Sequence, residues 1–424
     1  IIPLTKIMLT FFWTSKEQIQ WDLRPDSTKI TIIYWNLHMT QHRTLLDIVK
    51  QLAPELESKC ADSDNLGKLP MEVVKILREH GLFTMKLASE LGGIDADIVT
   101  YMDVIEELSR IDGAIGWNTM IGNSAIGRPG AFLPQSAINT MFKNNEIPLA
   151  ASVPSPSGKA TKTNGGFILS GTWYFSSGIN QSTWVSGGFI VENEKPACPR
   201  IACMPTSDLT IHDNWHVMGL KGTGSCSYSA NNLFVSDEFT FPINDDVPLR
   251  GGPMNYLGRP GFVTVDHAAV ALGIAKRALE TIVEISKSKM RGYNSDLKAV
   301  SERGYFKKDL GFAQTKLAAA RALVKESHLK AWEYTTQKTV PPPLIQSEMR
   351  NSGVYATEVS EEVTQIAFKY GGGGALYLDS KLQKCYRDVA ATGQHMMVNM
   401  SSYENYANFL LEVDGADAMG VKNN

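Results

Sequence analysis

The chain has 424 residues and a formal net charge of −3 at pH 7, with 43% hydrophobic and 20% charged residues. This is the composition of an ordinary soluble globular protein of two or three domains, and its dispersed lysines and arginines exclude a strongly basic nucleic-acid-binding or membrane-surface protein. The five cysteines are irregularly spaced without a C-x-x-C pair, which gives no sign of a disulfide framework or a zinc site. We therefore expect a cytoplasmic protein without a metal.

Residues 1–38 show neither a helical nor a strict strand period. Their longest apolar run is too short to span a bilayer, and they contain no signal-peptide pattern. Because regular periodicity starts only after Met39, we expect residues 1–38 to be a non-native or disordered extension.

Residues 39–148 predict an N-terminal α domain. Apolar residues recur every three or four positions from Thr40 onward, and Asp95 or Asp97 is placed to cap a later helix. The period changes to two after Pro148, which ends the domain.

Residues 149–250 predict a central β domain, because apolar residues alternate there between turn residues. The glycine- and hydroxyl-rich run 215–225 lies between two of its strands. Loops of this kind donate backbone N–H groups to a phosphate or a ring carbonyl.

The stretch 165–178 holds two apolar runs separated by Ser170-Gly171, which predicts two short strands joined by a tight turn. Two hydroxyls, Ser176 and Ser177, follow. Such a strand end offers flat aromatic faces and small hydrogen-bonding groups, which suit the edge of a planar heterocycle such as a flavin. A plain hairpin with core aromatics is the alternative.

Residues 251–424 predict a C-terminal bundle of four long helices with short connections. The second helix has a seam of small residues that permits close packing. The third ends at the four glycines 371–374, and the fourth carries Arg387-Asp388 and His395.

This order of domains resembles the acyl-CoA dehydrogenase superfamily, from about Met39 to the C-terminus. The resemblance implies an α+β fold with an N-terminal helical domain, a central β-barrel-like domain and a C-terminal four-helix bundle. It also implies a homotetramer with flavin at the domain junction. The motifs that carry it are residues 173–178, residues 215–225, and the glycines 371–374 followed by Arg387-Asp388.

Three details are more similar to the two-component flavin-dependent monooxygenases of the hydroxyphenylacetate hydroxylase and dibenzothiophene monooxygenase type. They are residues 115–117, residues 170–178, and a histidine at position 395, where a dehydrogenase would place a glutamate base. The resemblance implies a monooxygenase that takes reduced flavin, FMN or FAD, from a separate flavin reductase. With oxygen it would hydroxylate or oxidise a small aromatic or heteroatom-containing substrate.

His395 is the predicted catalytic residue, because an imidazole that titrates near neutrality suits a phenol or an amine better than a thioester. An ordinary histidine on an amphipathic helix is the alternative. The resemblance further implies cofactor contacts from Trp173, Phe175, Ser176, Ser177, Arg291, Gly372 and Gly373, and a substrate pocket that includes Trp117 and Asn118. The plainer interpretations are core aromatics for Trp173 and Phe175, a strand end for Ser176 and Ser177, a solvated charge for Arg291 and a helix stop for the glycines. We expect Arg387 and Asp388 to form a structural pair.

Two other functions stay open. Asp266 or Glu404 could serve as the base of an acyl-CoA dehydrogenase that oxidises an acyl-CoA thioester with FAD. A scaffold that kept the fold but lost the chemistry would bind no flavin. Some relatives grip the substrate with a second histidine in the N-terminal domain, but none follows Trp117 before His212, so the substrate stays open.

Overall fold

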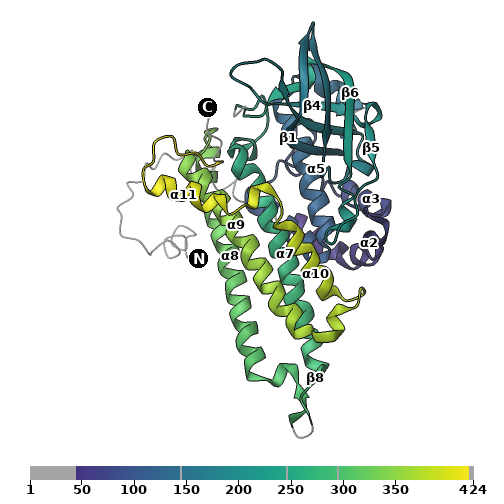
Figure 1. Cartoon of the computed structure of the whole chain (residues 1–424), viewed down its shortest axis with the longest axis vertical. Coiled ribbons are helices and arrows are strands. Elements are labelled where there is room, and N and C mark those ends of the chain that lie inside the picture. Colours follow the sequence, from purple (N-terminus) through teal and green to yellow (C-terminus); the bar gives the residue numbers. More distant parts are fainter. Residues whose placement is uncertain (1–43, 144–145, 245–246, 294–295, 420–424) are drawn as a thin grey trace, which may run out of the picture. The chain divides into compact units, whose positions relative to one another are not determined.

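The computed structural model describes residues 44–143, 146–244, 247–293 and 296–419 (Figure 1). The expectation for residues 1–38 therefore lies outside the described residues. Within those ranges, none of the helices is both long and apolar enough to cross a bilayer. No group of three potential metal ligands is found in the same ranges.

The N-terminal segment is helical, as predicted. Asp97 caps α4 by accepting hydrogen bonds from the backbone N–H groups of Val99 and Thr100, both at 3.0 Å. Asp112 caps the next helix, α5, through Ala114 N at 2.8 Å. The helices are residues 44–59, α2 (Ser63–Leu66), α3 (Met71–Glu79), α4 (Ile98–Ile111), α5 (Gly113–Phe132) and α6 (Gln135–Met141).

The central domain is one mixed seven-stranded sheet in the order β5-β6-β2-β1-β3-β4-β7. Strands β1 and β3 are parallel, and the other pairs are antiparallel. The predicted barrel-like closure is wrong, because the short strands β5 and β7 form two separate edges. The strands are β1 (Ala150–Thr163), β2 (Gly166–Trp173), β3 (Trp184–Val191), β4 (Arg200–Pro205), β5 (Thr210–His212), β6 (Ser227–Ser236) and β7 (Thr240–Pro242).

The predicted turn at Ser170-Gly171 is also wrong, because β2 runs through both residues as one strand. The irregularity there is a shift in register against β6 between Leu169 and Gly171. Glycine is required at 171 because an added Cβ would lie 2.8 Å from the Cα of Gly158 on β1. A packing contact across the sheet, rather than a turn, therefore explains this glycine.

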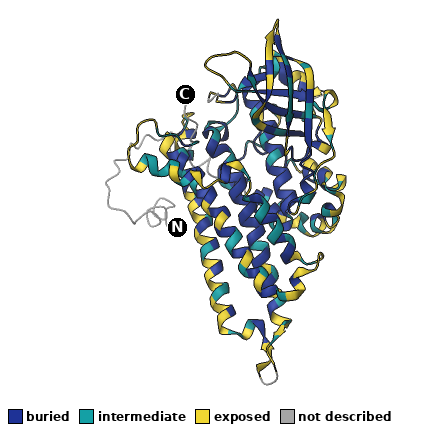
Figure 2. Cartoon of the chain, in the orientation of Figure 1, coloured by how far each residue is buried: buried dark blue, intermediate teal, exposed yellow. Residues whose placement is uncertain are grey.

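The C-terminal segment is the predicted bundle, in which α9 packs against α7 and α8. The seam of α8 is confirmed, since Ala313, Leu317 and Ala320 are buried while the opposite face of the helix is exposed (Figure 2). His395 does not lie on the fourth helix as expected, because α10 ends at Thr392 and His395 caps a short 3₁₀ turn. The elements are α7 (Gly258–Ser288), β8 (Met290–Arg291), β9 (Lys298–Ala299), α8 (Gly304–Thr335), α9 (Pro343–Gly371), η12 (Gly372–Leu376), α10 (Lys381–Thr392), η13 (Met396–Val398) and α11 (Ser401–Leu410).

Candidate active site

The segment after β2 turns sharply and lies against the loop 220–226. Phe175 has a φ of +67° and its side chain is 72% exposed. The backbone N–H of Ser176 donates to Cys226 O at 3.2 Å, and that of Gly178 donates to Thr223 O at 3.0 Å. The two glycine- and hydroxyl-rich stretches predicted from the sequence are thus brought together.

A chain of hydroxyl groups runs through this junction in one direction. The indole N–H of Trp117 on α5 donates to Ser177 Oγ at 2.9 Å. Ser177, Ser225 and Thr223 are linked at 2.7 and 2.6 Å, and the Thr223 hydroxyl lies 2.7 Å from Leu220 O. Because a carbonyl only accepts, Thr223 donates to Leu220, Ser225 donates to Thr223, and Ser177 donates to Ser225. The Ser177 oxygen can therefore only accept from a further partner.

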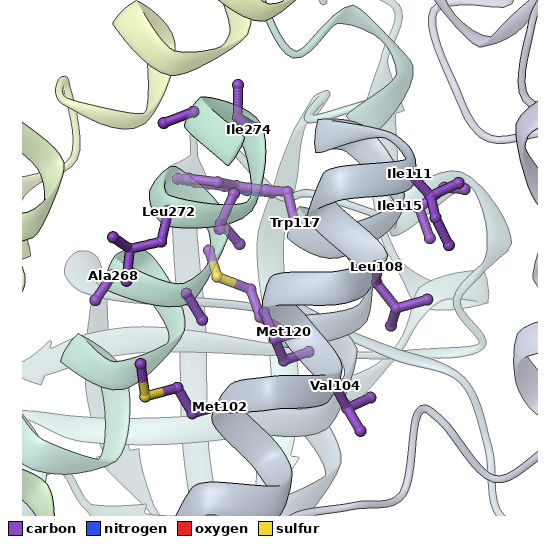
Figure 3. Close-up of a cluster of buried hydrophobic side chains, with 14 of the residues drawn as sticks. Met102, Val104, Leu108, Ile111, Ile115, Trp117, Met120, Ala268, Leu272 and Ile274 are labelled. Atoms are coloured by element: carbon purple, nitrogen blue, oxygen red, sulfur yellow. The ribbon is translucent and has the colours of Figure 1, made fainter. Parts of the chain in front are cut away.

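Trp117 also joins a cluster of three rings with His267 on α7 and His395. The ring centroids of His267 and His395 are 4.1 Å apart, and that of Trp117 lies 5.3 Å from His267 and 6.1 Å from His395. Figure 3 shows Trp117 on the side of α5 that faces α7. The hydroxyl chain and the ring cluster thus share one side chain.

The hydrogen bond of His395 fixes its tautomer. Its Nδ1 accepts from the backbone N–H of Met397 at 3.2 Å, so in the neutral ring the proton is on Nε2. Burial lowers the pKa of His395 to about 4. This shift runs against the expected titration near neutrality and favours a neutral ring that donates through Nε2 at physiological pH.

His267 was missed by the sequence analysis. Its side chain is 1% exposed, and burial lowers its pKa well below the usual value for histidine. The sequence did contain a sign that His267 is buried. Position 267 lies three residues before Val270 and seven before Ile274, and so falls on the apolar stripe of the same helix. A histidine on that stripe faces the interior.

Asp266 is held in a buried ion pair, with both carboxylate oxygens 2.8 Å from Lys86 Nζ. The Lys86 and Asp266 side chains are 0% and 2% exposed. Burial lowers the pKa of Lys86 and raises that of Asp266, and the ion pair opposes both changes. Glu404 is exposed on α11. Within the described residues, no hydrogen bond or ion pair joins either carboxylate to the ring cluster.

Family models support the fold. The model described as acyl-CoA dehydrogenase, N-terminal domain, matches residues 39–131, and the acyl-CoA dehydrogenase C-terminal domain model matches residues 265–400. The chain belongs to the acyl-CoA dehydrogenase superfamily.

Several relatives of this chain are named as monooxygenases or hydroxylases. Indole-3-acetate monooxygenase of Pseudomonas putida is 28% identical over 369 residues, 85% of this chain and 90% of that protein. The oxygenase component of p-hydroxyphenylacetate 3-hydroxylase from Acinetobacter baumannii is 23% identical over 396 residues, 89% of this chain and 90% of that protein. The solved structure of XiaF from Streptomyces sp. in complex with FADH2 and glycerol has a TM-score of 0.83 at 20% identity, covering 90% of this chain and 98% of that one.

The residues at the junction fit the flavin that the superfamily implies. Ser176 is completely buried, and its hydroxyl has no hydrogen-bond partner within the described residues. The exposed ring of Phe175 beside it packs edge-on against Trp215, with centroids 6.2 Å apart. An unpaired hydroxyl next to an exposed aromatic surface suits the polar edge of an isoalloxazine ring.

Trp173 lies in the sheet core, whereas Asn118 lies at the junction, where its Nδ2 donates to Gly222 O at 3.4 Å and its Oδ1 accepts from Gln181 at 3.3 Å. Trp173 is completely buried in the sheet, where it stacks on Tyr228 and donates to Gly188 O at 2.8 Å. The side chain of Asn118 donates to Ala114 O at 3.0 Å and is 2% exposed. The plainer interpretation, a core aromatic, therefore fits Trp173, while the place of Asn118 in a substrate pocket stays a prediction.

Arg387 and Asp388 do not pair with each other as expected. Arg387 binds Asp64 at 3.0 Å, and Asp388 binds Lys384 at 2.6 Å and accepts from the backbone N–H of Leu220 at 2.7 Å. The two side chains thus fasten α10 to α2 and to Leu220, whose carbonyl accepts the last hydrogen bond of the hydroxyl chain.

Arg291 and Gly372 lie together, but at the end of the bundle away from the sheet (Figure 1). An Nη2–H of Arg291 donates to Tyr370 O at 3.3 Å, and a Cβ on Gly372 would lie 2.7 Å from that nitrogen. Gly373 has open space beside it. Within one chain, these residues do not join the cluster of Ser176 and His395.

A pocket lies between α5, α7 and the sheet, and none of the three ring-cluster residues lines it. Ser124 and Arg128 follow Trp117 on α5 at seven and eleven residues, and therefore share its helix face. Arg259, Phe262 and Val263 line the pocket from α7, on the face that also carries His267. Its remaining walls are Pro129, Ser152, Pro154, Ser186, Ile201, Phe241 and Ile243.

Proposed function

We propose that this chain is the oxygenase component of a two-component flavin monooxygenase. The observation that carries the proposal is the Ser176-Ser177 turn beside the cluster of Trp117, His267 and His395. In the overall reaction, one atom of oxygen enters the substrate and the other leaves as water. The reduced flavin supplies the two electrons and two protons.

The side chains would bind, orient and exclude water. Ser176 and Ser177 would hold the polar edge of the flavin, with Phe175 against it. His395 would donate its Nε2–H to a polar group of the substrate. Trp117 would keep water away, because its ring is buried and its N–H is already bonded to Ser177.

The pocket favours an aromatic acid as the substrate. Arg259 has no hydrogen-bond or ion-pair partner among the described residues, and burial lowers its pKa. A partly buried guanidinium without a counterion attracts a carboxylate. About 12 Å of helix separates Arg259 from His267, a span that suits an arene with a short acid side chain. The substrates named for the two relatives, indole-3-acetate and p-hydroxyphenylacetate, have this form.

The partners would be a separate flavin reductase and three further copies of the chain. A homotetramer is supported by an exposed stripe on α8 that includes Tyr305, Phe312 and Leu323. A neighbouring copy would bring Arg291 and the glycines at 372 and 373 to the phosphate end of the flavin. Arg291 retains unused N–H donors for that purpose.

The function is tested by mixing the protein with reduced flavin and ¹⁸O₂ in the presence of indole-3-acetate or 4-hydroxyphenylacetate. We expect one ¹⁸O atom in the product. A panel of acyl-CoA thioesters, added anaerobically with oxidised FAD, should leave the flavin absorbance unchanged. Bleaching by a thioester without oxygen incorporation would establish the dehydrogenase alternative instead. Failure to bind flavin in either redox state would indicate an inactive scaffold.

We expect Ser177→Ala to weaken the binding of reduced flavin more than that of oxidised flavin. Ser177 can only accept a hydrogen bond from a ligand, and the flavin N5 carries a hydrogen only in the reduced state. The loss should be about 1 to 3 kcal/mol, or roughly 5- to 150-fold in Kd. Anaerobic titration with both redox forms measures it, and Ser170→Ala on β2 is the control. Equal losses for the two forms would contradict the assignment.

We expect Arg259→Gln to weaken the binding of an arylacetate by roughly 10- to 100-fold, because the carboxylate loses a charge-assisted partner. The corresponding uncharged arylacetamide should bind the variant and the wild type alike. Calorimetric titration of both ligands separates charge recognition from a loss of pocket shape. If the two ligands lose affinity equally, Arg259 does not recognise the carboxylate.

A further inference from the structure

The ammonium group of Lys384 on α10 is held by three carboxylates. Its Nζ lies 2.6 Å from Asp388 Oδ2, 3.1 Å from Asp112 Oδ2 and 3.5 Å from Asp64 Oδ1. The side chains of Lys384, Asp112 and Asp388 are 25%, 10% and 2% exposed, so water and salt screen these ion pairs only in part. Burial lowers the pKa of Lys384, but the three carboxylates together raise it well above the usual value for lysine. Lys384 is therefore charged at physiological pH.

Asp112 connects Lys384 to one end of the hydroxyl chain. While its Oδ2 binds Lys384, its Oδ1 caps α5 by accepting from Ala114 N–H at 2.8 Å. Trp117 lies three residues further along the same helix, and its indole N–H donates to Ser177. The first turn of α5 thus places the donor that occupies one lone pair of the Ser177 oxygen.

Asp388 connects Lys384 to the other end of the chain. Its Oδ1 accepts from the backbone N–H of Leu220 at 2.7 Å, while its Oδ2 binds Lys384. Leu220 has a φ of +51° and a ψ of 35°, a left-handed conformation that a leucine keeps only when its surroundings support it. In this conformation the Leu220 carbonyl accepts from the Thr223 hydroxyl, the contact that gives the chain its direction.

We propose that Lys384 is a positioning residue of the flavin site, which holds both ends of the hydroxyl chain and so keeps Ser177 an acceptor toward the flavin. The inference rests on the proposed function. Without the ammonium group, the carboxylates of Asp112 and Asp388 would lose their shared cation and repel each other. Leu220 would lose its support, and the released hydroxyl of Ser177 could then donate. A donor suits N5 of oxidised flavin, whereas an acceptor suits the N5–H of reduced flavin.

The test measures the affinities of the full-length protein for reduced and oxidised FMN and FAD by anaerobic titration. Their ratio, reduced over oxidised, is the redox preference. Lys384→Met keeps the length of the side chain but not its charge, and should lower the redox preference by roughly 5- to 30-fold. Lys384→Arg should retain most of it. The double variant Lys384→Met/Ser177→Ala should show the preference of Ser177→Ala alone, because both changes act through one hydroxyl.

Lys381→Met is the matched control on the same helix, since it breaks a surface ion pair with Glu57 and should leave the redox preference unchanged. Hydrogen exchange gives a readout without flavin: the amide of Leu220 should exchange faster in Lys384→Met but not in Lys381→Met. Asp388→Asn leaves two carboxylates and two cations in the cluster and places an N–H donor beside Lys384. It should also lower the redox preference, and it tests the connection even if Lys384→Met does not fold.

Equal losses of affinity for both flavin forms in Lys384→Met would overturn the inference and leave Lys384 a merely structural residue. A full redox preference in Asp388→Asn, or effects of Lys384→Met and Ser177→Ala that add, would overturn it as well. If the wild type binds neither form of flavin, the proposed function and this inference both fail. If Lys384 sets the redox preference but no ¹⁸O enters a substrate, the proposed oxygenation fails while this positioning role stands.

Discussion

His395→Ala should slow oxygen transfer to the substrate by roughly 10²- to 10⁴-fold, the usual range when a group that moves or orients a proton is removed. Flavin binding should change little, because the proposed flavin contacts come from Ser176 and Ser177. Oxygen would still be consumed, but it would be released as hydrogen peroxide. The measurement is the ratio of product formed to reduced flavin oxidised, with peroxide assayed in the same samples.

Two conservative variants separate the functions of the two nitrogens. His395→Gln places an amide near Nε2 and should retain part of the coupling, whereas His395→Asn retains only an acceptor for Met397 N–H and should resemble the alanine variant. Since burial lowers the pKa of His395 to about 4, the rate of oxygen transfer should show no inflection from this residue near pH 6.5. An inflection at pH 6.5 that disappears in His395→Gln would show that the ring acts as a titrating base.

Local patterns in the sequence predicted the helical domains well. The spacing of apolar residues on α8 and the cap at Asp97 depend on interactions a few residues apart, and both are confirmed. The closure of the sheet was not predictable in this way, because it depends on how distant strands pair. The glycine at 171 shows the same limit, because it is required by the close approach of Gly158 on β1, 13 residues earlier in the chain.

The candidate site was predictable only in part. Ser176 and Ser177 carry a local pattern, and both lie at the junction. His267 was overlooked because its neighbour Asp266 is the more conspicuous chemical group, and only the packing of α7 shows which of the two faces Trp117. The partners of Arg387 and Asp388 come from other elements of the chain, so adjacency in sequence suggested the wrong pairing.

Lys86→Met should lower the free energy of unfolding by about 3 to 5 kcal/mol, because it leaves the Asp266 carboxylate buried without its cation. Chemical denaturation measures the loss. The matched control is Lys330→Met, which breaks the ion pair to Glu348 on the surface and should cost less than about 1 kcal/mol. The double variant Lys86→Met/Asp266→Asn should recover more than half of the loss, since it removes the unpaired charge.

The stability of Lys86→Met should also depend on pH in a definite direction. Burial raises the pKa of Asp266, and without Lys86 the pKa rises further. The folded variant therefore binds a proton at a pH where the unfolded chain does not, so its stability should fall as the pH rises above the usual pKa of an aspartate. A dehydrogenase base at Asp266 predicts something else: Asp266→Asn would abolish flavin bleaching by an acyl-CoA thioester while leaving stability nearly unchanged. A large loss of stability in Asp266→Asn, without any bleaching in the wild type, would make Asp266 a structural residue that fastens α7, and with it His267, to the N-terminal helices.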